Sequence, residues 1–230
     1  MSSERPGVDK TREKLLVVAE DLIAARGFER STVSELCRRA AVTEKVFYTY
    51  FDGMDAVLHA LFATWVRQMH TVTEEATRSG IWKGSAARDV IEVAVRSVLD
   101  VILERPALVR AFLTKGDADP GMMAELRGIG TRLAERIVAV LAECRDVPVQ
   151  PERSVAFSLL VAVSLAHHYA LIGDEWSGAS FTAAQLSEET SRMICAYLGL
   201  GPTIRAMGEL PDGAPTGEVP TVEGPASRDR

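Results

Sequence analysis

The sequence predicts an all-α protein of about nine helices. Apolar residues recur at intervals of three and four along almost the whole chain, and this spacing places them on one side of an α-helix. A half-buried strand shows strict alternation of apolar and polar residues between turns. Such alternation is rare in this chain. Capping residues, glycines and prolines divide the helical pattern into successive segments.

The N-terminal part of the chain predicts three helices. The first ends at Gly27, a residue type that readily adopts the left-handed conformation common after a helix. The second begins with Thr32 and Glu35, spaced as a capping box in which each side chain satisfies a backbone N–H near the other. Thr43 caps the third helix, which residues 52–53 (Asp-Gly) end.

Longer helices follow from residue 54 onward. Pro106 ends one helix and begins the next, because proline cannot continue a helix but suits its first turn. After residue 200 the chain is rich in Pro, Gly, Thr and charge, and such a composition buries too little apolar surface to fold. Residues 201–230 are therefore expected to be a disordered tail. The expected helices cover residues 54–79, 86–104, 106–114, 121–143, 152–172 and 183–197.

The overall charge and the cysteines narrow the class of protein. A formal net charge of -6 argues against coating nucleic acid or anionic membrane by bulk electrostatics, but it leaves room for a local positive face. Cys37, Cys144 and Cys195 lie far apart and form no CxxC motif, so we expect neither a disulfide framework nor a zinc site. The N-terminus lacks the apolar run of a signal peptide, and a reducing cytoplasm fits best.

The segment 155–172 is almost continuously apolar and about as long as a minimal membrane span. Polar residues such as Ser158 and Ser164 interrupt it, which favours a buried helix over a membrane span. Its adjacent His167 and His168 point about 100° apart on a helix and cannot share a metal as an i, i+4 pair can. No metal site and no cofactor are predicted.

The stretch 43–51, TEKVFYTYF, concentrates aromatic residues in an aromatic-poor chain. On a helix, Val46, Phe47 and Tyr50 share one side and can seat the helix on its neighbours. The opposite side presents hydroxyl and charged groups, from Glu44, Lys45, Tyr48 and Thr49. Two short helices joined by a tight turn, the second with such a face, are what a helix-turn-helix needs to enter the DNA major groove.

Residues 11–62 resemble the N-terminal DNA-binding domain of the tetracycline-repressor (TetR) family. The motifs Gly27-Phe28, Thr32-Val33 and 47–51 (FYTYF) stand in register with the family pattern. The resemblance implies a three-helix DNA-binding domain in residues 1–53, followed in residues 54–200 by an effector-binding and dimerisation domain. The residues at which it implies DNA contacts are Val33, Ser34, Thr43, Glu44, Lys45, Tyr48, Thr49 and Tyr50.

Three residues depart from the family pattern. Ala41 replaces a common turn glycine, at a cost of about 1 kcal/mol if the position is left-handed. Met54 replaces a basic residue that would contact phosphate. Glu44 stands where lysine or a neutral donor is usual, although glutamate can accept from a cytosine amino group. Four arginines could flank the motif as phosphate partners: Arg26, Arg30, Arg38 and Arg39.

The resemblance implies a ligand-responsive transcriptional regulator, most often a repressor, which binds a near-palindromic operator as a homodimer and leaves it when a small molecule binds. The helix at 155–172 and the last helix are expected to form the two-fold interface. An apolar or aromatic effector is favoured by the bulky residues that could line its pocket. These are Trp65, Met69, His70, Phe112, Met123, His168 and Trp176.

Two other classes of function compete with a transcriptional regulator. An enzyme is disfavoured, because the chain shows no nucleophile–base pair, phosphate-binding glycine loop or supported carboxylate pair. A helical ligand-binding or interaction module with lost or altered operator binding remains open, in view of Ala41, Glu44 and Met54. The choice between repression and activation is also open, since it depends on where the operator lies.

Overall fold

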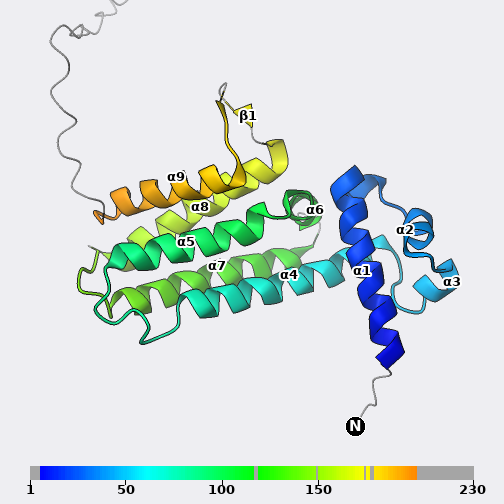
Figure 1. Ribbon diagram of the computed structural model, residues 1–230, viewed down its shortest axis with the longest axis horizontal. Coiled ribbons are helices and arrows are strands. Elements are labelled where there is room, and N and C mark those ends of the chain that lie inside the picture. Colours follow the sequence, from blue (N-terminus) through cyan, green and yellow to red (C-terminus); the bar gives the residue numbers. More distant parts are fainter. Residues whose placement is uncertain (1–5, 117–118, 149, 174, 177–178, 201–230) are drawn as a thin grey trace, which may run out of the picture.

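The computed structural model describes residues 6–116, 119–148, 150–173, 175–176 and 179–200, so the expected tail lies outside the described residues. Within them the protein is all-α apart from one two-stranded hairpin, which confirms the predicted class (Figure 1). The elements are α1 (Pro6–Arg26), η1 (Phe28–Arg30), α2 (Val33–Ala40), α3 (Glu44–Phe47), α4 (Met54–Ala76), α5 (Ala87–Leu103), α6 (Pro106–Gly116), α7 (Pro120–Leu141), α8 (Pro151–Ile172), β1 (Glu175–Trp176), β2 (Ala179–Ser180) and α9 (Ala183–Tyr197).

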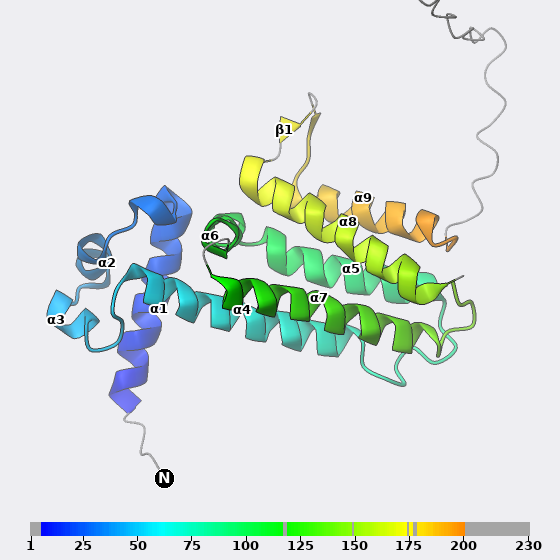
Figure 2. The same ribbon diagram turned by 180° about the vertical axis from the view of Figure 1, so that it is seen from behind.

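The helices form a small N-terminal unit and a longer bundle. Helices α1, α2 and α3 lie at one end, and α4 runs from that end along the bundle (Figure 1). Helix α5 packs against α4 and α9, whereas α7 and α8 form the reverse face (Figure 2). Helix α6 lies between the two parts and contacts both α1 and α8. One continuous hydrophobic core runs through both parts, from Leu15 to Leu198.

Two predictions for the N-terminal helices need correction. The Thr32 hydroxyl accepts the Glu35 N–H at 3.3 Å, but the Glu35 carboxylate turns to arginines instead, so the predicted reciprocal capping box does not form. The third helix ends at Phe47 rather than near residue 51. The N–H groups of Thr49 and Tyr50 bond carbonyls three residues back, which is the tighter 3₁₀ geometry common at helix ends.

The fourth helix is also shorter than predicted, ending at Ala76 instead of residue 79. The following loop, residues 77–86, is fastened to the end of α7. The Glu143 carboxylate accepts the Ser79 hydroxyl and the Gly80 N–H, each at 2.8 Å. These hydrogen bonds, the one from Ser79 first, hold the pKa of Glu143 below its usual range. These hydrogen bonds therefore fix the loop 77–86 against the bundle.

Helix α8 is only partly buried in the single chain. It is long and apolar enough to cross a membrane, yet only 33% of its most apolar 18-residue window is buried, which leaves a face free for the partner subunit that the sequence leads us to expect. Phe157 and Leu160 are 50% and 63% exposed, respectively. The physical reason is geometric: the helix packs on one side against α5, α6 and α7 and leaves its other side uncovered in the single chain.

The turn between α2 and α3 places Ala41 in the left-handed region, at φ 51° and ψ 47°. We expect Ala41→Gly to raise the free energy of unfolding by about 0.5–1 kcal/mol, because relief of the left-handed strain exceeds the added entropy of the unfolded chain. Chemical denaturation checks this. The comparison variant is Ala40→Gly, at the fully buried last residue of α2, which should lower stability because a buried methyl group and backbone rigidity are both lost. A loss of stability in both variants would contradict the strain at Ala41.

Candidate DNA-binding face and ligand-binding regions

The short helix α3 is held by one buried ring. Phe47 is 0% exposed and contacts the rings of Tyr48 at 5.3 Å and Phe51 at 5.8 Å between centroids. The Thr43 hydroxyl caps the helix by accepting the Val46 N–H at 3.3 Å. The Arg12 guanidinium lies 5.4 Å from the centre of the Phe51 ring. Phe47 therefore seats the helix, as the sequence predicts, while its neighbours on the chain turn outward.

Six of the predicted DNA-binding residues are exposed on or directly beside α2 and α3, and we call this set the α2/α3 face. Tyr48 is 55% exposed, and the Thr49 hydroxyl donates to the Lys45 carbonyl at 3.1 Å. Val33 and Tyr50 are only partly exposed and pack against the core. The α2/α3 face comprises the exposed Ser34, Thr43, Glu44, Lys45, Tyr48 and Thr49.

Sequence reasoning placed Val46 on the inner side of the third helix, and this is wrong. Val46 is 38% exposed. A helix of one turn is too short for the 100° spacing to divide inner from outer positions cleanly, so periodicity carried no signal for this residue. An exposed valine beside Lys45 can make apolar contact with a thymine methyl group, which adds a candidate base-reading residue to the α2/α3 face.

Glu35 gathers three of the four arginines expected to bind phosphate. Arg38 donates two hydrogen bonds to its carboxylate at 2.8 and 2.9 Å, Arg39 donates one at 2.9 Å, and Arg26 lies 3.8 Å away. Hydrogen bonds from Arg38 and then Arg39 lower the pKa of Glu35 from 4.5 to about 2. This stabilisation is present above pH 4.5 and is lost as the pH falls towards 2. The cluster offers less free positive charge than the sequence suggests.

We expect Glu35→Gln to strengthen DNA binding about threefold and to steepen its salt dependence, because one more arginine charge becomes available to phosphate. Fluorescence anisotropy of a labelled duplex at several salt concentrations measures both quantities. Glu135→Gln makes the same charge change on an exposed part of α7 and is the control. Unchanged affinity and salt slope in Glu35→Gln would show that these arginines do not face the DNA.

Cys37 is a packed core residue. It is 4% exposed on the inner side of α2, and burial raises the pKa of its thiol. A raised pKa lowers the fraction of reactive thiolate at neutral pH.

The predicted effector-binding residues divide into separate groups. Trp65 and Phe112 meet at 5.8 Å between ring centres and, with Phe62, form a buried aromatic cluster. Met69 is buried nearby on α4, Met123 lies against Gly116, and His168 is partly exposed on α8. His70 instead faces the surface, with its Nε2 3.2 Å from Arg132 and 3.8 Å from Glu125. Trp176 belongs to β1, and its side chain lies outside the described part of the structure.

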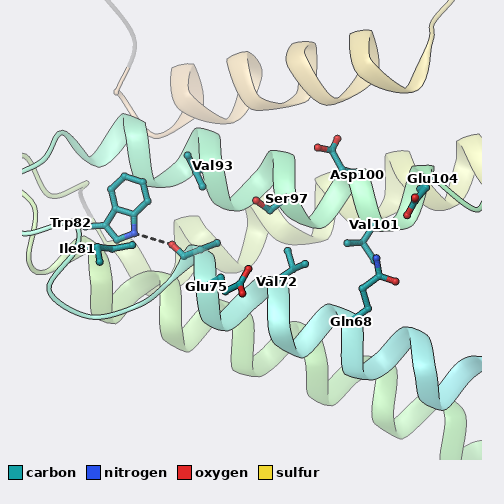
Figure 3. A pocket seen from close by; sticks show the side chains of 11 residues that line it. Gln68, Val72, Glu75, Ile81, Trp82, Val93, Ser97, Asp100, Val101 and Glu104 are labelled. Atoms are coloured by element: carbon teal, nitrogen blue, oxygen red, sulfur yellow. Dashed lines mark hydrogen bonds between the residues drawn. The ribbon is translucent and has the colours of Figure 1, made fainter.

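One buried polar atom marks the aromatic cluster. The Trp65 side chain is 5% exposed, and its Nε1 has no hydrogen-bond partner in the described structure. A buried N–H without an acceptor is costly. A separate hollow of about 720 Å³ lies between α4, α5 and the loop 77–86 (Figure 3), and no predicted effector residue lines it.

Helices α8 and α9 present a joint apolar surface. The rings of Phe157 on α8 and Tyr197 on α9 lie 5.3 Å apart, and both side chains are about half exposed, at 50% and 53%. Leu160 is 63% and Met193 46% exposed. We call these four residues the α8/α9 apolar face. Contiguous exposed apolar surface of this kind marks an interaction site.

Helix α6 connects the bundle to the N-terminal unit through charged contacts. Arg105, just before α6, pairs with Glu20 of α1 at 3.0 Å. Lys115, at its other end, lies 3.8 Å from Glu29, 3.5 Å from Asp55 and 5.2 Å from the centre of the Phe28 ring. A movement of α6 would therefore change its ion pairs with both α1 and the start of α4.

The described residues contain no group of three His, Cys, Asp or Glu side chains arranged to hold a metal ion. His167 is part-buried on α8, and desolvation lowers its pKa. At neutral pH this ring is therefore the uncharged form.

Comparison with known proteins identifies both parts of the chain. Residues 15–61 match the model of bacterial regulatory proteins of the tetR family, and residues 88–198 match that of tetracyclin repressor-like C-terminal domains. The HTH-type transcriptional regulator EthR of Mycobacterium tuberculosis is 24% identical over 197 residues, covering 83% of this chain and 84% of EthR.

Solved structures share the fold. A transcriptional regulator from Rhodococcus sp. RHA1 superposes with a TM-score of 0.62 at 20% identity, covering 82% of this chain and 96% of the other. The fatty acid degradation regulator FadR of Bacillus halodurans gives a TM-score of 0.59 at 12% identity, covering 89% and 99%. At these identities the similarity extends to the arrangement of helices.

Proposed function

Because this chain belongs to the tetR family of bacterial regulatory proteins, as a helix-turn-helix transcriptional regulator rather than an enzyme, we propose that it is a ligand-released repressor. In this proposal residues 1–53 bind a near-palindromic operator, and residues 54–200 hold the effector and the dimer interface. The protein acts in the cytoplasm, where its DNA lies.

The α2/α3 face is the observation that carries the proposal. Lys45 on α3, and Tyr48 and Thr49 directly after it, are exposed, and the fully buried Phe47 ring anchors this segment to the core. Hydroxyl and ammonium donors suit phosphate oxygens and base edges. Glu44 and Val46 add an acceptor and an apolar group to the same surface.

Dimerisation supports operator binding in this proposal. Two α3 helices enter successive major grooves only when they lie about 34–36 Å apart, or a multiple of that distance. The α8/α9 apolar face is suited to a two-fold contact, in which Phe157 and Leu160 meet their counterparts on a second copy.

Release by an effector fits the connection between the two parts. An apolar or aromatic molecule entering beside Trp65, Met69 and Phe112 could supply the acceptor that the Trp65 N–H lacks. Such a molecule would displace α4 and α6, which contact the DNA-binding unit. A coupling of about 1–3 kcal/mol between effector and operator is typical. Met123, His168 and Trp176 remain further candidates for effector contact, whereas His70 faces the surface beside Arg132 and Glu125 and is not proposed for this interior site.

The test is selection of bound fragments from the source genome, followed by titration of the best fragment with and without candidate ligands. Recovery of a near-palindrome whose complex a ligand dissolves would support the repressor. No enrichment even at low salt would instead support a helical binding module without operator activity.

Point variants test the α2/α3 face on the selected fragment. Tyr48→Phe and Lys45→Ala should each weaken binding about three- to tenfold, because each removes one hydrogen bond or charge at the DNA. Lys83→Ala, in the loop 77–86, is the control for general loss of charge. Unfolding curves should match the wild type. Undiminished binding in both test variants would remove these residues from the interface.

A further inference from the structure

The hollow of about 720 Å³ between α4, α5 and the loop 77–86 has the size of a small-molecule site. Its walls mix apolar and polar side chains: Val72 comes from α4, Val101 and Ser97 come from α5, and Trp82 closes one end (Figure 3). Ile81 and Val93, at the same end, are 53% and 41% exposed. Apolar side chains therefore face solvent inside this hollow. The hollow is a different region from the aromatic cluster of Trp65 and Phe112.

The charged residues that line this groove are all acidic, although Glu75 also borders a second hollow that Arg78 and Arg136 line. Glu75 lines the groove from α4, Asp100 from α5, and Glu104 from the position that caps the end of α5. No lysine or arginine is among the residues that line it. Glu104 has Arg105 at 3.7 Å, but Glu75 and Asp100 form no ion pair within the described structure. Asp100 and Glu104 also stand four residues apart on one helix, a spacing at which like charges repel.

Hydrogen bonds hold the walls of the groove in fixed positions. The Trp82 Nε1–H donates to the Ala76 carbonyl at 2.8 Å, which fixes the edge of the indole. The loop that carries Trp82 is held to α7 by the Glu143 carboxylate and by the Arg145 N–H, which donates to the Ser85 carbonyl at 3.1 Å. A preformed wall lowers the entropic cost of binding.

We propose that this groove binds a small organic cation with an apolar or aromatic body. The carboxylates of Glu75 and Asp100 would attract the positive charge, and the indole of Trp82 would contact the apolar body and the cation through its ring. Anionic ligands are disfavoured by the three carboxylates. The site is separate from the predicted interior effector residues, and it does not depend on operator binding.

Isothermal titration with three probes of similar shape tests the charge preference. The probes are the tetraphenylphosphonium cation, neutral triphenylphosphine oxide and the tetraphenylborate anion. The cation should bind at least about tenfold more tightly than the neutral probe, and the anion should bind more weakly still. Equal affinity for the cation and the neutral probe would overturn the proposal.

Variants locate the binding. The double substitution Glu75→Gln with Asp100→Asn should weaken cation binding about tenfold and leave the neutral probe unchanged. The matched control, Asp21→Asn with Glu135→Gln, removes the same charge from exposed positions on α1 and α7. Trp82→Leu should weaken both the cation and the neutral probe. An equal loss in the test and control doubles would show that the net charge of the protein attracts the cation, and the groove assignment would fall.

Discussion

Replacing Phe47 with alanine is expected to lower the free energy of unfolding by about 3–5 kcal/mol and to abolish specific DNA binding. The side chain is 0% exposed, and its ring contacts both neighbouring aromatic residues, Tyr48 and Phe51. Helix α3 has a single turn, and so short a helix has no stability of its own. Without the buried ring, α3 loses the contact that seats it on the core, and the residues around it on the α2/α3 face lose their fixed positions.

Chemical denaturation followed by circular dichroism measures the loss in Phe47→Ala, and duplex titration measures DNA binding. Val17→Ala, at a 61% exposed position of α1, is the control and should change stability by less than about 0.5 kcal/mol. A loss below about 1 kcal/mol in Phe47→Ala would mean that other contacts hold the recognition helix.

Leu160→Asp is expected to convert the proposed dimer into a monomer and to weaken operator binding by at least about a hundredfold. Leu160 is 63% exposed at the α8/α9 apolar face, and two aspartates brought together at a two-fold contact would bury unpaired charge. A monomer binds one half-site and forfeits the added affinity of the second, which commonly reaches about 10²–10⁴.

Light scattering after size-exclusion chromatography gives the mass of Leu160→Asp, and titration of the selected operator gives its affinity. Val147→Asp, at a 51% exposed valine in the segment between α7 and α8, controls for the new charge. A Leu160→Asp protein that remains dimeric and binds the operator normally would place the subunit contact elsewhere.

The long helices could be predicted because their periodic apolar spacing repeats over several turns. The last helix spans residues 183–197 both as predicted and as observed, and Pro106 begins α6 as expected. Phe47 and Phe51 are buried as the sequence indicates. The resemblance to the family, which often has glycine at this turn, raised the question of a left-handed Ala41, and the structure places Ala41 in that region.

Other features depend on contacts that a linear pattern does not contain. The Glu35 carboxylate binds Arg38 and Arg39 instead of the backbone N–H of Thr32 that a capping box would use. Charged donors within one helical turn form stronger hydrogen bonds than a backbone N–H. The hairpin β1–β2 has only two residues in each strand, too few for alternation to be visible. The groove between α4, α5 and the loop 77–86 is formed by segments that lie apart in the sequence. Glu143, just after the end of α7, holds the loop in place.

The exposed ion pairs at the two ends of α6 have a consequence for ionic strength. Arg105–Glu20 and Lys115–Asp55 are partly exposed pairs, and such contacts weaken as salt screens them. The N-terminal unit is then tethered less stiffly, so its copies sample a wider range of orientations relative to the bundle. Salt would therefore weaken DNA binding in two ways. It screens the DNA phosphates, and it weakens the ion pairs of α6 that orient the two DNA-binding units of the proposed dimer.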